Sequence, residues 1–157
     1  MMLLVAHCDR RKKGGFMFKQ KSLLTIGMLG ALLTAPLAMA ETHTVTAQGM
    51  AFQPLVIKIA PGDTVAWEKM STHNVEMMEG LIPEGTEAFK SPMSENYRHT
   101  FEEEGIYVYQ CTPHIGAGMG GAVIVGEPKN LEAVKAQDVK GGLKRVADKA
   151  IAEAEGM

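Results

Sequence analysis

The residues of this sequence that could do chemistry together lie in one short segment. Cys111, His114 and Met119 supply a thiolate, an imidazole and a thioether in the spacing C-x2-H-x4-M. Glycines at alternate positions of the segment let the backbone fold back, so that the three side chains can reach one point. Soft sulfur together with borderline imidazole nitrogen suits copper in both of its oxidation states. We therefore interpret the segment as part of a copper site.

A fourth ligand must come from another part of the chain, and His73 is the best candidate. It lies in a turn over 71–74, at the start of a strand-like run. Two histidines and a cysteine with a weak axial methionine describe a blue-copper electron-transfer centre. Pro113 stiffens the loop that carries the cysteine. Because four protein ligands leave no open position for a substrate, we expect electron transfer and no enzyme activity.

The elements that must position these ligands are short β-type runs, separated by glycine, proline and acidic turns. The runs fall at 43–47, 55–59, 64–68, 73–78, 96–101, 106–111 and 121–125. Several of them alternate apolar and polar residues, as half-buried antiparallel strands do. Seven or eight short strands in about 85 residues favour an all-β sandwich over a barrel with a large ligand cavity.

The pattern changes to a helical one after residues 127–129. Asn130 is placed to cap a short helix over 131–137, and Gly141-Gly142 separates this helix from a second one. The second helix carries one apolar stripe, made of Leu143, Val146, Ala147, Ala150 and Ile151. A stripe of this kind packs on a core, so we expect a sandwich over 41–126 and a helical extension of the same domain over 127–157.

The first 40 residues have the organisation of a secretory signal peptide. A basic start is followed by an apolar stretch over 23–33 and by Ala38-Met39-Ala40, the small-x-small pattern that a signal peptidase needs. The stretch is shorter than the roughly 20 apolar residues of a spanning helix, so we expect no membrane anchor in the mature form. We expect cleavage after Ala40 and export, with Met17 as an alternative translation start.

Charge and cysteine content divide at the same point. The whole chain has a formal net charge of −2, and six basic residues against one acid give the first 40 residues +5, so residues 41–157 carry −7. An acidic balance of this kind excludes a strongly basic nucleic-acid binder. Removing the leader also removes Cys8, which leaves Cys111 as the sole cysteine. A lone thiol is unusual in an exported protein, where it pairs between chains, reacts or binds a metal.

These residues resemble those of the cupredoxins, and more closely those of the pseudoazurins. The resemblance covers essentially the whole chain after residue 40, in APGDTVAWE (60–68), THNVE (72–76), GLIPEGTEAFKS (80–91), the run 96–126 and NLEAVK (130–135). The CTPH loop alone is also similar to plastocyanin-like and amicyanin-like loops. Amicyanin-like loops are shorter between the histidine and the methionine, and plastocyanin-like chains lack the two C-terminal helices, so pseudoazurin is favoured.

The resemblance carries a fold and a ligand set with it. It implies an all-β, cupredoxin-like Greek-key β-sandwich with two short C-terminal helices packed on it. By position, it implies one type 1 copper ion held by His73, Cys111, His114 and Met119. Asn74 matches a residue that ties the two ligand loops together by hydrogen bonds, which orients the ligands.

The resemblance also implies a partner class. It implies a periplasmic, monomeric carrier that exchanges electrons with redox proteins such as a nitrite reductase or a cytochrome c. Met50 matches an apolar residue packed near the exposed imidazole. We expect the electron to pass through the edge of His114, inside an apolar patch formed with Met50, Ile115 and Ala117. The ring of lysines that often surrounds the copper end of these proteins is thin here.

Two other kinds of protein would use a similar ligand set. A copper carrier or storage protein would hold Cu(I) in exchangeable, solvent-open sites and would use more methionine or cysteine. A structural zinc site would also accept a cysteine and two histidines. The ligand types by themselves leave both alternatives open. His43 and His99 have no ligand-like neighbours in the sequence, and we interpret both as structural.

Overall fold

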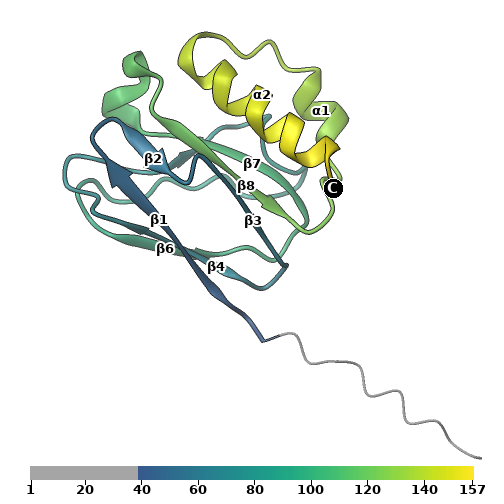
Figure 1. Cartoon of the computed structure of the whole chain (residues 1–157), viewed down its shortest axis with the longest axis horizontal. Helices are drawn as coiled ribbons and strands as arrows, with labels where there is room; N and C mark the ends of the chain where they lie inside the picture. The colour runs from purple at the N-terminus through teal and green to yellow at the C-terminus, as the bar shows by residue number, and fades with distance from the viewer. Residues whose placement is uncertain (1–38) are drawn as a thin grey trace, which may run out of the picture. The chain divides into compact units, whose positions relative to one another are not determined.

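The computed structural model describes residues 39–157. The predicted signal peptide, apart from its last two residues, and the alternative start at Met17 lie outside the described residues. The described chain folds into two β-sheets of four strands each, with helices packed against one of them (Figure 1). The predicted all-β sandwich with C-terminal helices is therefore confirmed.

The first sheet has the strand order β2-β1-β4-β6 and the second has the order β3-β8-β7-β5. Their bounds are β1 Thr42–Gln48, β2 Ala51–Gln53, β3 Val56–Ile59, β4 Thr64–Glu68, β5 Glu76–Met77, β6 Tyr97–Thr100, β7 Gly105–Gln110 and β8 Gly120–Val125. The expectation of antiparallel pairing is wrong for two pairs, because β1·β4 and β3·β8 are parallel. The chain changes sheet between β2 and β3 and again between β3 and β4, so strands that run in the same direction become neighbours.

The inner faces of the two sheets enclose an aromatic core. Trp67 of β4 is fully buried, and its ring meets the ring of Tyr109 on β7 edge-on, with centroids 5.5 Å apart. Phe52 on β2 also contacts the Tyr109 ring, with centroids 5.2 Å apart. Rings packed in this way contribute contact energy beyond the area they bury. Because β7 ends directly before Cys111, this core fixes the strand that positions the cysteine.

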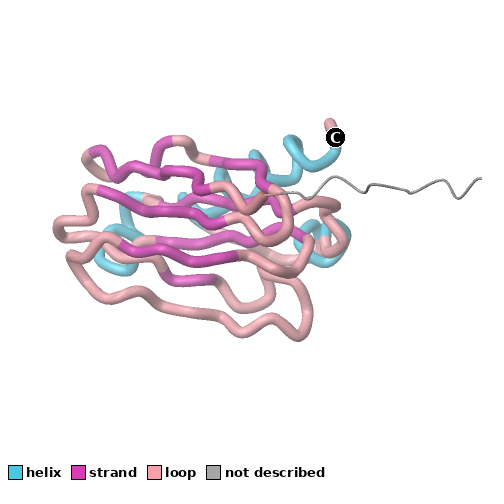
Figure 2. The backbone as a smooth tube through the Cα atoms, turned by 90° about the horizontal axis from the view of Figure 1, so that it is seen from below, coloured by secondary structure: helices cyan, strands magenta, loops and turns pink. Residues whose placement is uncertain are grey.

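The two C-terminal helices form a second hydrophobic cluster on the outer side of β7 and β8. They span α1 Leu131–Lys135 and α2 Gly141–Glu155, and α2 crosses the sheet as Figures 1 and 2 show. In the predicted stripe, Val146, Ala147 and Ala150 are buried, and Leu143 and Ile151 are half-buried. Covered on both faces, β7 and β8 are buried at every position. None of the helices in residues 39–157 is long and apolar enough to cross a membrane.

Several predicted element bounds are wrong, each for a local reason. The run 73–78 forms only the two-residue β5, because the backbone before it bonds to the loop 91–94 through Ser91 N to Val75 O (2.8 Å) and Ser94 N to His73 O (2.9 Å). The short strand β2 was not expected from the sequence. The first C-terminal helix ends at Lys135, before the predicted 137.

Asn130 does not cap the first helix with its side chain, as the sequence suggested. Its Oδ1 accepts a hydrogen bond from Ile106 N at 2.7 Å, and its Nδ2 donates to Ile106 O at 2.9 Å. The amide side chain thus satisfies both backbone groups of one residue in β7, much as a neighbouring strand would. Asn130 therefore joins the helical extension to the sandwich.

Gly141 and Gly142 begin the second helix instead of separating two helices. A Cβ placed on Gly142 would lie 2.2 Å from the Cα of Gly118, in the segment that carries the cysteine and histidine. Only hydrogen at both positions permits this backbone approach. The glycine contact therefore seats the start of α2 directly against the ligand segment.

We predict that Gly142→Ala lowers the free energy of unfolding of the copper-free protein by about 1–3 kcal/mol, the usual cost of overpacking. The sign of the change distinguishes packing from helix propensity, because alanine is a better helix former than glycine by about 1 kcal/mol and propensity alone would raise the stability. Urea unfolding of the variant measures the change. Gly116→Ala is the matched control in the same segment, since its Cβ meets nothing within 4 Å. Equal stabilities for the two variants would contradict the packing role.

Candidate metal centre

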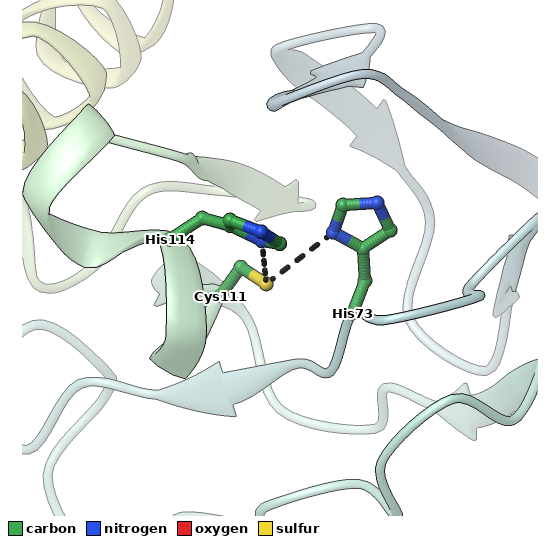
Figure 3. A group of neighbouring side chains, drawn as sticks. All are labelled: His73, Cys111 and His114. Atoms are coloured by element: carbon green, nitrogen blue, oxygen red, sulfur yellow. Dashed lines mark hydrogen bonds between the residues drawn. The ribbon is translucent and has the colours of Figure 1, made fainter.

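Three side chains from two distant parts of the chain meet at one end of the sandwich. His73, Cys111 and His114 place one potential ligand atom each so that all three lie within 4.8 Å of one another. The Cys111 Sγ lies 3.6 Å from His73 Nδ1 and 3.4 Å from His114 Nδ1, as Figure 3 shows. Both imidazoles therefore aim the same ring nitrogen at one sulfur. Within residues 39–157 no other histidine, cysteine or acidic side chains gather in such a group.

The segment after Cys111 closes on itself through its backbone. It forms a short 3-10 helix, η1 (Thr112–Ala117), and Gly118 ends the helix in the left-handed region at φ 71°. The chain then returns, because Met119 N donates to His114 O at 3.2 Å and Cys111 N donates to Met119 O at 2.9 Å. Met119 is 1% exposed. The loop thus brings the predicted axial methionine back beside the cysteine and the histidine.

The three ligand candidates differ in how far solvent reaches them. Cys111 is fully buried and His73 is 7% exposed, whereas His114 is partly exposed. Burial lowers the pKa of His73, and the nearby imidazole of His114 lowers it further. A neutral imidazole is the form that binds a metal. The site therefore has a dry interior and one ring that reaches the surface.

Asn74 links the two segments that carry the ligands. It is fully buried, and its Nδ2 donates to Thr112 Oγ1 at 2.9 Å while its Oδ1 accepts from Thr112 N at 2.8 Å. Each segment is therefore bound to the other through a residue next to a ligand candidate. Pro113 occupies the first turn of η1, where its fixed φ suits the helix start.

A carboxylate that the sequence analysis missed extends this link. Glu76 Oε2 accepts hydrogen bonds from Gln110 Nε2 at 2.9 Å and from Thr112 Oγ1 at 3.2 Å. Its Oε1 accepts from Lys90 Nζ at 3.0 Å. The Gln110 amide, followed by Lys90, holds the pKa of Glu76 below its usual value. No sequence pattern signals this group, because Glu76 and Gln110 are 34 residues apart and meet only when β5 pairs with β7.

The surface near the partly exposed imidazole is apolar. Ile115 in η1 is 51% exposed, and Ala117 is exposed as well. Met50 is 61% exposed and lies in the turn between β1 and β2, at the same end of the sandwich as η1 (Figure 1). Met93, which the sequence analysis did not select, is 47% exposed and precedes the residue whose backbone bonds to His73.

The two other described histidines lie outside the cluster. His43 Nε2 is 2.9 Å from Asp63 Oδ2, and the His99 ring stacks on Phe89 with centroids 4.1 Å apart. Both contacts hold structural elements together, in line with the structural interpretation of these histidines. They leave His73 as the histidine that joins Cys111 and His114.

The donor set fits copper. One buried thiol, two imidazole nitrogens aimed at it and a buried methionine in the same loop combine soft sulfur with nitrogen, the combination that accommodates both copper oxidation states. Acidic side chains, which zinc and harder cations accept, are not part of the described cluster. The arrangement can therefore hold a single copper ion.

Comparisons with known proteins agree with this chemistry. A family model described as copper binding proteins of the plastocyanin/azurin family matches residues 39–126. A putative pseudoazurin of Rhizobium leguminosarum bv. viciae is 38% identical over 138 residues, covering 83% of this chain and 91% of the relative. A pseudoazurin of Paracoccus pantotrophus is 41% identical over 111 residues, covering 66% of this chain and 76% of the relative.

A solved structure also shows similarity to the pseudoazurins. The structure of a pseudoazurin from Sinorhizobium meliloti superimposes with a TM-score of 0.67 at 44% identity, covering 74% of this chain and 98% of that one. The resemblance seen in the sequence is thus confirmed, and with it the cupredoxin fold and a copper cofactor. The chain belongs to the plastocyanin/azurin family of copper-binding proteins and, within it, to the pseudoazurins, which are blue copper electron carriers.

Proposed function

We propose that the mature protein is a periplasmic one-electron carrier whose copper ligands are His73, Cys111, His114 and Met119. The observation that carries the ligand assignment is the meeting of a fully buried thiol with two imidazole Nδ1 atoms, 3.4 and 3.6 Å from its sulfur. Copper bound by these residues would supply a centre that accepts and releases one electron.

The buried and the exposed residues of the site have different roles in an electron carrier. Burial of Cys111 and His73 keeps water and foreign ligands away, while the edge of His114 reaches the surface. An electron therefore has a short path through one ring. Because four protein ligands leave no open position, we propose no substrate turnover at the metal.

We predict that the copper-loaded protein has an intense visible absorption from thiolate-to-Cu(II) charge transfer, which vanishes on reduction and returns on oxidation. Cys111→Ser removes the thiolate and should abolish the band. His99→Gln is a matched control, because His99 contacts Phe89 outside the cluster, and it should leave the band unchanged. Loss of copper on reduction would favour the copper carrier or storage alternative, and a colourless protein would favour zinc.

We propose that redox partners dock on the apolar patch of Met50, Ile115 and Ala117 around His114. Two lysines near this end pair with carboxylates of the protein: Lys90 with Glu76 at 3.0 Å and Lys140 with Asp138 at 3.0 Å. The protein after residue 40 is also acidic overall. Small apolar contacts keep a complex weak enough to turn over, and the partner class is a periplasmic nitrite reductase or cytochrome c.

We predict that electron transfer to such a partner depends only weakly on ionic strength, because salt screens charged docking and leaves apolar docking intact. Ile115→Lys should lower the second-order rate constant about tenfold or more by placing a charge in the patch. Ala133→Lys adds the same charge to α1, at the other end of the molecule from η1 (Figure 1), and should change the rate little. Stopped-flow mixing measures both, and equal effects would contradict docking at the patch.

We propose cleavage after Ala40, which makes Glu41 the first residue. Glu41 N donates to Asp63 Oδ1 at 2.8 Å, and Asp63 is 6% exposed. Asp63 Oδ2 also accepts from Ala60 N at 2.9 Å and contacts His43 Nε2 at 2.9 Å. The two backbone donors, Glu41 and then Ala60, hold the pKa of Asp63 below its usual 3.8. Cleavage at this point would turn a neutral amide donor into an ammonium group beside an anionic carboxylate.

We predict that protein beginning at Glu41 is more stable at pH 6 than protein that retains Met39 and Ala40, by about 1 kcal/mol, the difference between a charged and a neutral hydrogen bond. The gain should be absent in an Asp63→Asn background. It is present above pH 3.8, where the free carboxyl is ionised, until the α-ammonium group loses its proton near its usual pKa of about 7.7. It is lost as the pH falls through the lowered pKa of Asp63 in the folded state. Thermal unfolding of the four proteins measures it, and equal stabilities of the two lengths would contradict the proposed ion pair.

A further inference from the structure

We propose that Glu76 is a positioning residue whose fixed carboxylate sets the balance between the oxidised and reduced forms of the site. The proposal rests on the proposed copper site and adds a residue that does not touch the metal. Glu76 lies three residues after His73, in the two-residue strand β5. Its register partner in β7 is Gln110, the residue directly before Cys111.

The carboxylate binds the residues on both sides of the cysteine. Gln110 precedes Cys111 and Thr112 follows it, and both donate hydrogen bonds to the same oxygen, Glu76 Oε2, at 2.9 and 3.2 Å. A carboxylate accepts two such bonds without strain, because each of its oxygens has two lone pairs. Glu76, in the strand that leads out of the His73 turn, therefore holds the side chains on both sides of Cys111.

The negative charge of Glu76 also fixes the direction of the neighbouring hydrogen bonds. An ionised carboxylate can only accept, so the single hydroxyl proton of Thr112 must point to Glu76. Thr112 Oγ1 is then left to accept from Asn74 Nδ2 at 2.9 Å, and Asn74 Oδ1 faces Thr112 N at 2.8 Å. The Glu76 carboxylate thus orients the buried Asn74 amide beside His73. Donor and acceptor are fixed for every hydrogen bond that links the two ligand segments.

Electrostatics gives the sign of the effect. The oxidised copper site has one more positive charge than the reduced site, so a nearby negative charge stabilises the oxidised form more. Glu76 Oε2 faces inward to Gln110 and Thr112, whereas Oε1 faces Lys90. The Lys90 side chain is 52% exposed and that of Glu76 is 28% exposed, so solvent screens the lysine more. Removing either charge should therefore shift the equilibrium, and the two shifts should have opposite signs.

We test this with three variants of the copper-loaded protein. Glu76→Gln keeps the size of the side chain and one oxygen acceptor but removes the charge. It should favour the reduced form about tenfold, which raises the reduction potential by about 59 mV for a one-electron couple. Lys90→Met removes the opposite charge and should favour the oxidised form by about two- to threefold. Glu79→Gln removes an exposed carboxylate on the same segment that forms no ion pair within residues 39–157, and should change the balance by less than twofold.

Redox titration followed by the visible band measures these shifts, and thermal unfolding of the copper-free variants reports structural damage separately. Opposite shifts for Glu76→Gln and Lys90→Met support the positioning role. Shifts of the same sign, or none in either variant, overturn it. A wild-type protein without a visible band contradicts the proposed copper site itself, whatever the variants do. If Glu76→Gln fails to fold, Lys90→Met and Thr112→Val decide, because Thr112→Val breaks the oriented link at its centre and should also favour the reduced form.

Discussion

The position of one buried sulfur atom is the constraint on which the rest of this structure depends. Cys111 is fully buried, and its Sγ lies between imidazoles from segments 38 and 3 residues away in the sequence. A thiol in that position is useful only if both rings hold their orientation, and side chains hold their orientation when their surroundings are packed and bonded. The aromatic core under β7, the hydrogen bonds of Asn74 and the contact between Gly118 and Gly142 all restrict the same loop.

The helical extension has a direct part in this arrangement. By covering the outer face of β7 and β8 it makes both strands buried at every position, and its first turn lies against the ligand loop. The sandwich supplies the strand that ends at the cysteine, and the helix supplies the support behind the loop that follows. A sheet with one face in water would leave this loop supported from one side only.

Burial and charge distinguish the buried interior of the site from its exposed, apolar side. Cys111 and His73 are buried, the partly exposed imidazole of His114 lies near an apolar surface, and Lys90 near the site is paired with Glu76. Such a surface differs from a docking face built on uncompensated lysines, because its contacts depend on shape and apolar area and little on long-range attraction. The acidic balance of the protein after residue 40 fits a surface of this kind.

Local sequence determined much of this protein. The ligand types and their spacing, the apolar stripe of the second helix and the strands at 64–68 and 106–111 could be predicted, because each depends on residues that are near each other in the chain. The pairing of strands within each sheet could not be predicted. The parallel pairs β1·β4 and β3·β8 follow from how the chain passes between the sheets.

The tertiary structure alone decided the finer parts of the site. Glu76 meets Gln110 and Thr112 only when β5 pairs with β7, and Asn130 prefers the backbone of Ile106 to its own helix. Gly142 reads as a break between helices in the sequence, yet it begins α2 because it must lie against Gly118. In each case a contact between residues far apart in the chain outweighed the local preference. Burial and hydrogen bonding stabilise the contact by more free energy than the unfavourable local propensity costs.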